Sequence, residues 1–158
     1  MISEILLFLF VINLGIAFGA GLYEMRIVLP LWFTKSAGGY RVNHQAMREI
    51  DTGRKFWGMV TTLPLTILTV ANLVLAFRSG GLLHDWWLAA SVVVLAERIA
   101  TFAFFIPTAI KLQKSETMEA SKVGATVATW VRVNYVRILL NAVGLVAAMR
   151  ALMLISQA

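Results

Sequence analysis

The chain has 158 residues, of which 59% are hydrophobic and 14% charged, and its mean hydropathy is +0.80. Soluble domains are roughly half apolar and about a quarter charged, so this composition excludes an ordinary soluble domain and favours a membrane protein. The absence of cysteine excludes disulfides, thiolate-bound metals and a cysteine nucleophile. The net charge of +6 does not indicate nucleic-acid binding, because the basic residues gather in the segments that join apolar stretches.

Four apolar stretches are each long enough to cross a bilayer as a helix, which takes roughly 20 residues. The first is an uncleaved helix and not a signal peptide, because its start is acidic at Glu4 and its apolar run is long enough to span. The expected fold is therefore all-α, an integral membrane four-helix bundle that forms a single transmembrane domain over 1–158. The predicted spans cover residues of about 2–29, 56–77, 85–110 and 125–154.

In chain order, the first span ends near Pro30 and is followed by Trp32, an aromatic residue suited to the headgroup boundary. The segment 30–55 comes next and contains the turn signal Gly38-Gly39. We expect it to form a short interfacial helix or a cap folded over the mouth of the bundle. The third span begins with Asp85-Trp86-Trp87, which is typical of an interfacial anchor.

The distribution of Lys and Arg predicts the orientation in the membrane. The opposite side of the predicted bundle carries Arg78 and Arg150, whereas most basic residues belong to the loops 30–55 and 111–124 or their edges. Because basic loops stay in the cytoplasm, both termini are expected on the non-cytoplasmic side of a bacterial inner (plasma) membrane. The basic residues of the loop side are Arg26, Lys35, Arg41, Arg48, Arg54, Lys55, Lys111, Lys114 and Lys122.

Each span carries small or polar residues at helical spacing, which predicts four stripes that face one another inside the bundle. For the Thr and Asn members, holding helices together is the favoured interpretation. The stripes are Asn13, Ala17, Ala20 and Glu24; Thr62, Thr66 and Thr69 with Asn72; Glu97, Thr101, Phe104 and Thr108; and Trp130, Asn134, Arg137 and Asn141.

The charged members of these stripes favour a functional site. An ionised side chain inside the bilayer costs about 2.5–3.5 kcal/mol on insertion scales, so it is expected to find a partner within the bundle. Counting depth along the antiparallel third and fourth spans predicts that Glu97 pairs with Arg137. Since a buried ion pair adds little net stability, function is the favoured reason for this pair. Glu24 is expected nearer the cytoplasmic mouth.

Short motifs in all four spans resemble one membrane family. These are Gly21-Leu22-Tyr23-Glu24, Phe56-Trp57, Arg98-Ile99-Ala100-Thr101, and a W-x-x-x-N-x-x-R pattern at Trp130, Asn134 and Arg137. The chain is similar to a bacterial and fungal four-helix family, catalogued as a domain of unknown function, that includes the fungal anthrone oxygenases. The resemblance covers nearly the whole chain, although the Pro-x-Asn of that family stands here as Pro107-Thr108-Ala109.

The resemblance implies oxygen insertion into an electron-rich polycyclic phenol by a monooxygenase that uses no cofactor, with Trp130, Asn134 and Arg137 at the site. In such chemistry a base removes a proton and donors stabilise the enolate that meets oxygen. The base would be His44, by position alone, or Glu24, and Arg137 with Asn134 would be the stabilisers. No metal is expected, because Glu24, Glu97 and His44 can meet only if the loop folds inward. Candidate ligand-binding residues are Tyr23, Trp57, Glu97, Thr101, Trp130 and Asn141.

The first hypothesis is a membrane protein that binds, and by resemblance oxygenates, a lipophilic aromatic or quinone-like small molecule in a polar pocket within the bundle. The first alternative is a non-catalytic accessory subunit of a larger membrane complex, docked through faces that bear Gly and Ala, such as Gly15 and Gly19. The second alternative is a small-solute transporter that acts as an oligomer. The expected partners are the lipid bilayer, the small molecule, and a second copy or a larger complex.

Overall fold

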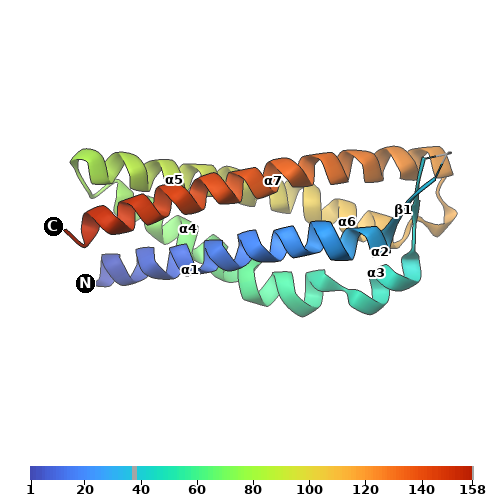
Figure 1. The fold of residues 1–158 in the computed structure, drawn as a ribbon, viewed down its shortest axis with the longest axis horizontal. Helices are drawn as coiled ribbons and strands as arrows, with labels where there is room; N and C mark the ends of the chain where they lie inside the picture. The colour runs from blue at the N-terminus through green and yellow to red at the C-terminus, as the bar shows by residue number, and fades with distance from the viewer. Residues whose placement is uncertain (37–38, 158) are drawn as a thin grey trace.

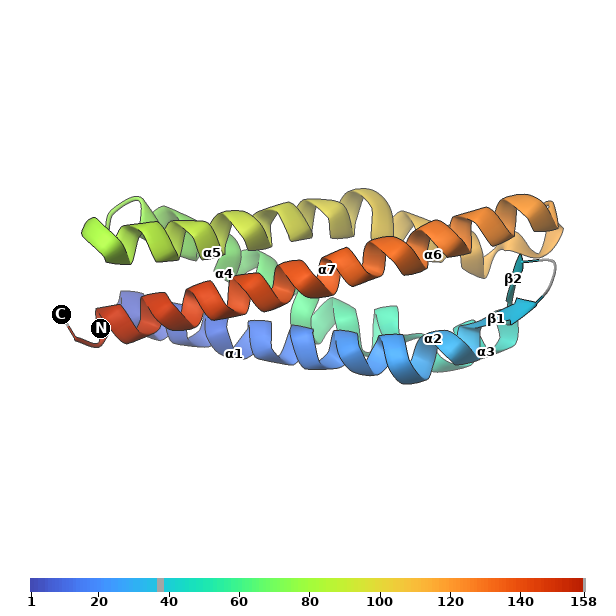
Figure 2. The same cartoon turned by 45° about the horizontal axis from the view of Figure 1, so that its top comes forward.

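Four long helices run side by side, and each is antiparallel to the next in the chain (Figure 1 and Figure 2). The computed structural model describes residues 1–36 and 39–157, so Gly38 of the predicted turn lies outside the described residues. The helices long and apolar enough to cross a membrane are Ile2–Trp32, Gly53–Ala76, Gly81–Gln113 and Ala120–Ile155. The prediction of a multi-pass integral membrane helical bundle is confirmed, and both termini lie at the same end of it (Figure 1).

Each of the first three spans is made of several helical segments. The first consists of α1 (Ile2–Tyr23), η1 (Glu24–Val28) and α2 (Leu29–Trp32). The second consists of η2 (Gly53–Thr62) and α4 (Leu63–Ala76). The third consists of α5 (Gly81–Ala100), η3 (Thr101–Phe105) and α6 (Ile106–Gln113). After the 3-10 turn η4 (Ser115–Thr117), the single helix α7 (Ala120–Ile155) forms the fourth span.

The segments η1, η2 and η3 are π-helical, and each ends two residues before a proline. The residues are Pro30, Pro64 and Pro107, which are all the prolines of the chain. A proline lacks the N–H group, and its ring clashes with the carbonyl four residues back, so the preceding turn widens. The sequence predicted that the first span ends near Pro30. In the structure the span continues through Pro30 to Trp32.

The segment between the first two spans closes the end of the bundle opposite the termini (Figure 2). The strands β1 (Phe33–Ser36) and β2 (Gly39–Val42) pair antiparallel, and they are the departure from the all-α expectation. The short helix α3 (His44–Ile50) follows, with the Asn43 side chain accepting a hydrogen bond from the Ala46 amide. Figure 1 places the hairpin across the end of α7, and we refer to the hairpin with α3 as the cap.

Two side-chain contacts fasten the cap to the connection between the third and fourth spans. His44 Nε2 lies 3.0 Å from Ser115 Oγ, and Arg48 Nη1 forms an ion pair with Glu116 Oε1 at 2.6 Å. The hairpin backbone at Tyr40 also lies against Gly124 of α7, where an added Cβ would meet it at 3.5 Å. The cap is therefore held by both side-chain and backbone contacts.

The half of the bundle nearer the termini has an apolar core with very close helix packing. At Gly144 in α7, an added Cβ would lie 2.6 Å from Val94 of α5, so the glycine lets these helices approach. Trp87 is buried, and its indole Nε1 donates to Asn72 Oδ1 at 2.9 Å. Trp87 and Trp32, which the sequence predicted at the headgroup boundary, are 2% and 4% exposed, so both rings pack inside the protein.

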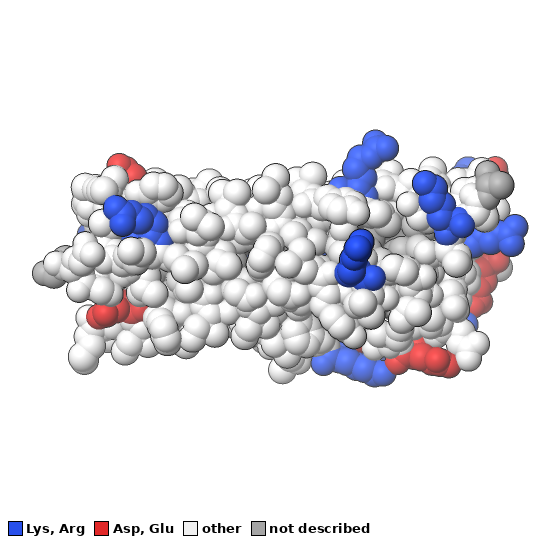
Figure 3. All heavy atoms as spheres, in the orientation of Figure 1, with Lys and Arg blue, Asp and Glu red and all other residues white. Residues whose placement is uncertain are grey.

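Charged side chains gather toward the two ends of the bundle and leave an apolar belt between them (Figure 3). Exposed Glu4 and Arg26 are 22 residues apart on the first span, about 33 Å at the helical rise of about 1.5 Å per residue. Arg132 and Arg150, both exposed, are 18 residues apart on α7, about 27 Å. These lengths match a hydrocarbon core of about 30 Å, so the cap projects beyond it.

Candidate ligand-binding site

The bundle holds a cavity of about 100 Å³ in the half nearer the cap. A single water needs only about 10–15 Å³ by the same measure, so the cavity has room for a small molecule or part of a larger one. All four spans and the cap contribute to its wall, with Glu24, Trp57, Glu97 and Arg137 from the spans and Met47 from α3.

Glu24 connects three spans at one side of the cavity. Its Oε2 pairs with Arg137 Nη2 at 3.1 Å, while its Oε1 accepts from Thr52 Oγ1 at 2.8 Å and from Trp57 Nε1 at 2.7 Å. The guanidinium of Arg137 also lies 4.5 Å from the ring centre of Phe105 and 5.1 Å from that of Trp57, within the range of cation–π attraction. The side chains of Arg137 and Glu24 are thus only 10% and 6% exposed, and neighbouring residues fix both.

Glu97 forms a second ion pair, with its neighbour Arg98. The Arg98 Nε donates to Glu97 Oε2 at 2.6 Å, Nη2 contacts the same oxygen, and Thr101 Oγ1 donates to Oε1 at 2.9 Å. The predicted pairing of Glu97 with Arg137 is therefore wrong, although both residues line the cavity. Because Val94 lies against Gly144 in these antiparallel helices, Glu97 lies level with Asn141, one turn away from Arg137.

Four polar atoms in the cavity wall have no hydrogen-bond partner within residues 1–36 and 39–157. They are the donors Trp32 Nε1, Trp130 Nε1 and Arg98 Nη1, and the acceptor Asn141 Oδ1. Buried polar groups are almost always hydrogen-bonded, and leaving one unpaired costs about 1–3 kcal/mol. These atoms belong to residues of the cavity wall, and they are candidates for hydrogen bonds to a bound molecule.

Aromatic rings supply much of the remaining wall. Trp32, Trp57, Phe105 and Trp130 all line the cavity, and Phe105 packs edge to face on Trp130 with ring centres 5.7 Å apart. Flat aromatic surfaces with a few convergent polar groups are typical of sites for small organic molecules.

The third span shows how the π-helical turn selects the residues that face the cavity. The sequence predicted a stripe of Glu97, Thr101, Phe104 and Thr108 at α-helical spacing. In the structure, every fourth residue of this span lines the cavity, because η3 is wider than an α-helical turn. The residues at this spacing are Glu97, Thr101, Phe105, Ala109 and Gln113, and their neighbours Arg98 and Ile106 also line the cavity.

Most of the predicted site residues come together, but three do not line the cavity. Those that line it are Glu24, Trp57, Glu97, Thr101, Trp130, Arg137 and Asn141. Asn134 is fully buried nearby, with both side-chain amide atoms unpartnered in the described part of the chain. Tyr23 lies in a groove on the outside of the bundle, and His44 lies in the cap beside Ser115.

The lining residues that the sequence did not predict include Trp32, Thr52 and Arg98. The signal for Arg98 was present, since two adjacent opposite charges inside an apolar span have to be accommodated together. Trp32 was read as interfacial from its position after Pro30. Across residues 1–36 and 39–157, no three His, Asp or Glu residues lie close enough to hold a metal ion.

Fold and site together define the class of protein: a multi-pass membrane bundle of four spanning helices with a polar, aromatic-walled cavity in one half. Comparisons of the chain with protein-family models, curated proteins and solved structures found no match.

Proposed function

We propose that the protein binds a lipophilic aromatic or quinone-like small molecule with its oxygen-bearing ring in the interior cavity. The observation that carries the proposal is the set of three unpartnered donors, on Trp32, Trp130 and Arg98, in a wall otherwise rich in aromatic rings. Ring oxygens accept such hydrogen bonds, and the indole and phenyl faces pack on a flat ring. The Asn141 oxygen suits a hydroxyl group on the same ring.

The charges around the cavity favour a neutral ligand. Glu24 is paired with Arg137 and Glu97 with Arg98, so the four ionised groups balance within the protein. A charged ligand would add an uncompensated charge close to hydrocarbon, at a cost of a few kcal/mol. A neutral ring with carbonyl or hydroxyl groups adds none.

Replacing Trp130 by Phe tests the hydrogen-bonding role, because this change removes the N–H donor and keeps an aromatic ring. The probe is 2,3-dimethoxy-5-methyl-1,4-benzoquinone, titrated into the protein in lipid nanodiscs and followed by calorimetry. Loss of one hydrogen bond should weaken binding about five- to tenfold. Trp86→Phe, at an exposed indole away from the cavity, is the matched control and should change affinity by less than about twofold. Equal affinities of the two variants, or no saturable binding by the wild type, would contradict the proposal.

Oxygenation of the bound ring is a second candidate function, favoured by the position of Arg137. Its guanidinium lines the cavity, where it can stabilise the negative charge of an enolate. Glu24 lines the same cavity and is the better placed candidate base, because His44 lies in the cap. Net oxidation of an anthrone CH₂ to a carbonyl consumes one O₂ and releases one water. Oxygen uptake above autoxidation, lost in Arg137→Met and kept in Trp86→Phe, would support this function, and uptake at the autoxidation rate would exclude it.

We also propose that the cap faces the cytoplasm and the termini the opposite side of a bacterial inner membrane. Support comes from the basic residues, since Lys35, Arg41, Arg48 and Lys55 all belong to the cap or its edges. Positively charged loops are retained on the cytoplasmic side.

A further inference from the structure

A groove of about 450 Å³ runs along the outside of the bundle between α1 and η2. Its floor and sides are mostly apolar, with Gly19 and Ala20 on α1, Phe56 on η2, and Tyr23 at its edge. No side chain of the described residues lies within 4 Å of the place where a Cβ on Gly19 would stand. The groove therefore exists because small residues on α1 face a bulky aromatic side of η2.

The groove opens on the outer surface of the bundle. Tyr23 at its edge is 61% exposed, and the apolar residues Ile16 on α1 and Val60 on η2 are exposed too. Glu24 lies only two residues before Arg26, where the apolar belt ends on the cap side. The groove thus occupies the part of the belt next to the headgroups, and a molecule dissolved in the bilayer has direct access to it.

Three residues line both this groove and the interior cavity: Glu24, Thr52 and Trp57. They form the wall between the two spaces, and Glu24 Oε1 joins them by accepting from Thr52 Oγ1 and Trp57 Nε1. Both hydrogen bonds are made by side chains. Side-chain rotation alone can therefore break these two contacts of the wall.

We propose that the groove holds the apolar chain of the ligand whose ring occupies the cavity, so that the ligand is a long-chain amphipath that enters sideways from the bilayer past Glu24, Thr52 and Trp57. This inference rests on the proposed function. The ring meets the unpartnered donors inside, while the chain stays in an apolar environment at the lipid boundary. A cavity of about 100 Å³ has no space for a long chain, and the adjoining groove supplies it.

The other candidate occupant of the groove is a helix from a second copy of the chain. Gly15 and Gly19 are four residues apart and both exposed, the spacing through which membrane helices approach closely. The ligand chain is favoured because Gly19 lines the groove that reaches Glu24, whereas Gly15 does not line it. The two glycines lie on the same helix and differ in lining the groove, and this difference provides the test.

The experiment compares Gly19→Leu with Gly15→Leu. At both positions the space beyond the backbone is open and leucine favours a helix more than glycine, so both variants should fold. Each is titrated in phosphatidylcholine nanodiscs with two probes, a benzoquinone bearing a decyl chain and 2,3-dimethoxy-5-methyl-1,4-benzoquinone, with concentrations expressed in the membrane phase. We expect Gly19→Leu to weaken binding of the decyl quinone about tenfold and to leave the chainless quinone within about twofold. Gly15→Leu should change neither by more than about twofold.

Equal effects of the two leucine variants on the decyl quinone would overturn the inference, as would an unchanged affinity in Gly19→Leu. Native mass spectrometry compares the oligomeric state of the wild type with that of the two variants. If the wild type is a dimer and both variants are monomers, a second copy occupies the groove and the inference fails. If the chainless quinone still binds in any of these outcomes, the inference about the groove fails but the proposed function stands. Failure of the wild type to bind either probe would refute the proposed function itself.

Discussion

At the scale of single residues, Glu24 organises the site. Its carboxylate forms an ion pair with a guanidinium on α7. It also accepts hydrogen bonds from an indole N–H on η2 and from the hydroxyl of the residue before η2. The antiparallel register of α1 and α7 puts Glu24 beside Arg137, since Glu4 lies near Ser156 and Gly21 lies near Ile138. The partner of Arg137 was thus decided by helix register, which depth counting from predicted span ends estimates only to within about a turn.

A double-mutant cycle tests this pairing. Glu24→Gln leaves the Arg137 charge buried without its counter-ion, so the free energy of unfolding should fall by about 3–5 kcal/mol, measured by titration with sodium dodecyl sulfate. Adding Arg137→Met to Glu24→Gln should restore part of that loss, because the unpaired charge is removed as well. The comparison cycle uses Glu97→Gln with Arg137→Met and should show the smaller coupling energy. A larger coupling of Arg137 to Glu97 than to Glu24 would contradict the ion pairing described above.

Within η4, the pKa of Glu116 should respond to the cap. The hydrogen bond from Arg48 and the positive charge of that guanidinium hold the pKa of Glu116 below its ordinary value of 4.5. A carboxyl with a lowered pKa stabilises the fold above its unfolded pKa, and this contribution is lost as pH falls through the lower folded value. Arg48→Met should therefore raise the pKa of Glu116, measured by carbon NMR of the carboxyl. Glu119, whose pKa is lowered by hydrogen bonds from Ser121 and Lys122, serves as the internal control and should not move.

At the scale of elements, the three π-helical segments shape the site. η1 begins at Glu24, η2 contains Trp57, and η3 runs from Thr101 to Phe105, so each contributes to the cavity wall. π-helical turns are rare and frequently occur at functional sites. The prolines that follow them are visible in the sequence, but a proline predicts a kink or an end of the helix, and the surrounding packing decides which occurs.

The contact of α5 with α7 makes a second prediction at this scale. Gly144→Ala places a methyl group 2.6 Å from the Val94 side chain, so Val94 or one of the helices has to shift and the free energy of unfolding should fall by about 1–3 kcal/mol. Gly15→Ala is the matched control, because the same methyl group on α1 meets open space and improves helix propensity by up to about 1 kcal/mol. Detergent-induced unfolding of both variants checks the difference. Equal stability of the two proteins would show that the α5 and α7 backbones are farther apart than described.

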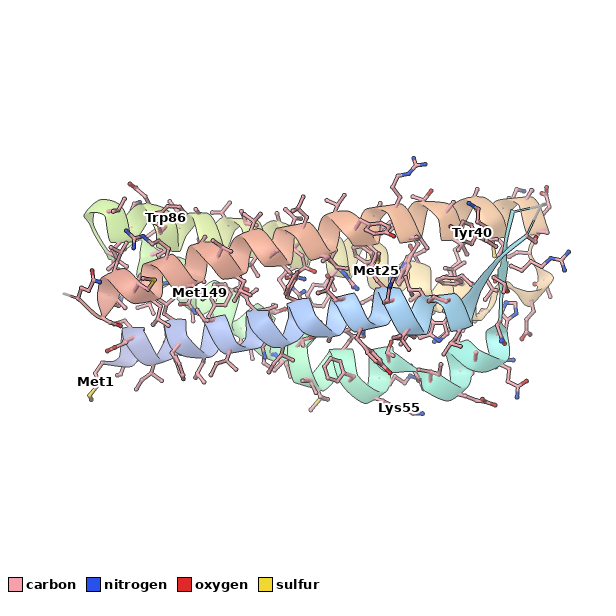
Figure 4. The ribbon with its side chains drawn as sticks, viewed as in Figure 1. Met1, Met25, Tyr40, Lys55, Trp86 and Met149 are labelled. Carbon is pink, nitrogen blue, oxygen red and sulfur yellow. The ribbon has the colours of Figure 1, made fainter. Side chains whose placement is uncertain are left out.

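At the scale of the whole molecule, the apolar belt and the cap define which parts of the chain meet water. The belt is about 27–33 Å long between exposed charges on α7 and the first span, close to the hydrocarbon thickness of a bilayer. The cavity lies in the cap-side half of the bundle, where Met47 of α3 contributes to its wall. Tyr40 of the hairpin lies at this end of the molecule, and Met1 lies at the other end (Figure 4). The proposed ligand would therefore lie between the hydrocarbon core and the cap.

The orientation is open to a direct test because the chain has no native cysteine. Ser156→Cys lies exposed near the termini, and Ser121→Cys lies exposed at the start of α7 on the cap side. A membrane-impermeant maleimide added to intact spheroplasts should label Ser156→Cys at once and Ser121→Cys only after lysis. The reverse order of labelling would place the cap outside, and the proposed topology would then be withdrawn.

The sequence by itself determined the spans and identified seven of the residues that line the cavity, including its charged and amide side chains Glu24, Glu97, Arg137 and Asn141. Runs of about 20 apolar residues have one stable solution in a bilayer, because every backbone polar group has to be satisfied within a helix. A charged or amide side chain in such a run turns inward for the same energetic reason, which is why Glu24, Glu97, Arg137 and Asn141 were found.

Only the tertiary structure decided which of these side chains meet. Partner choice depends on helix register and rotation, and a wide π-helical turn changes both by part of a turn, so Phe105 replaced Phe104 at the cavity. The burial of Trp32 and the position of His44 in the cap depend on how the loop folds back over the bundle. Such contacts join residues far apart in the chain, and local spacing carries no information about them.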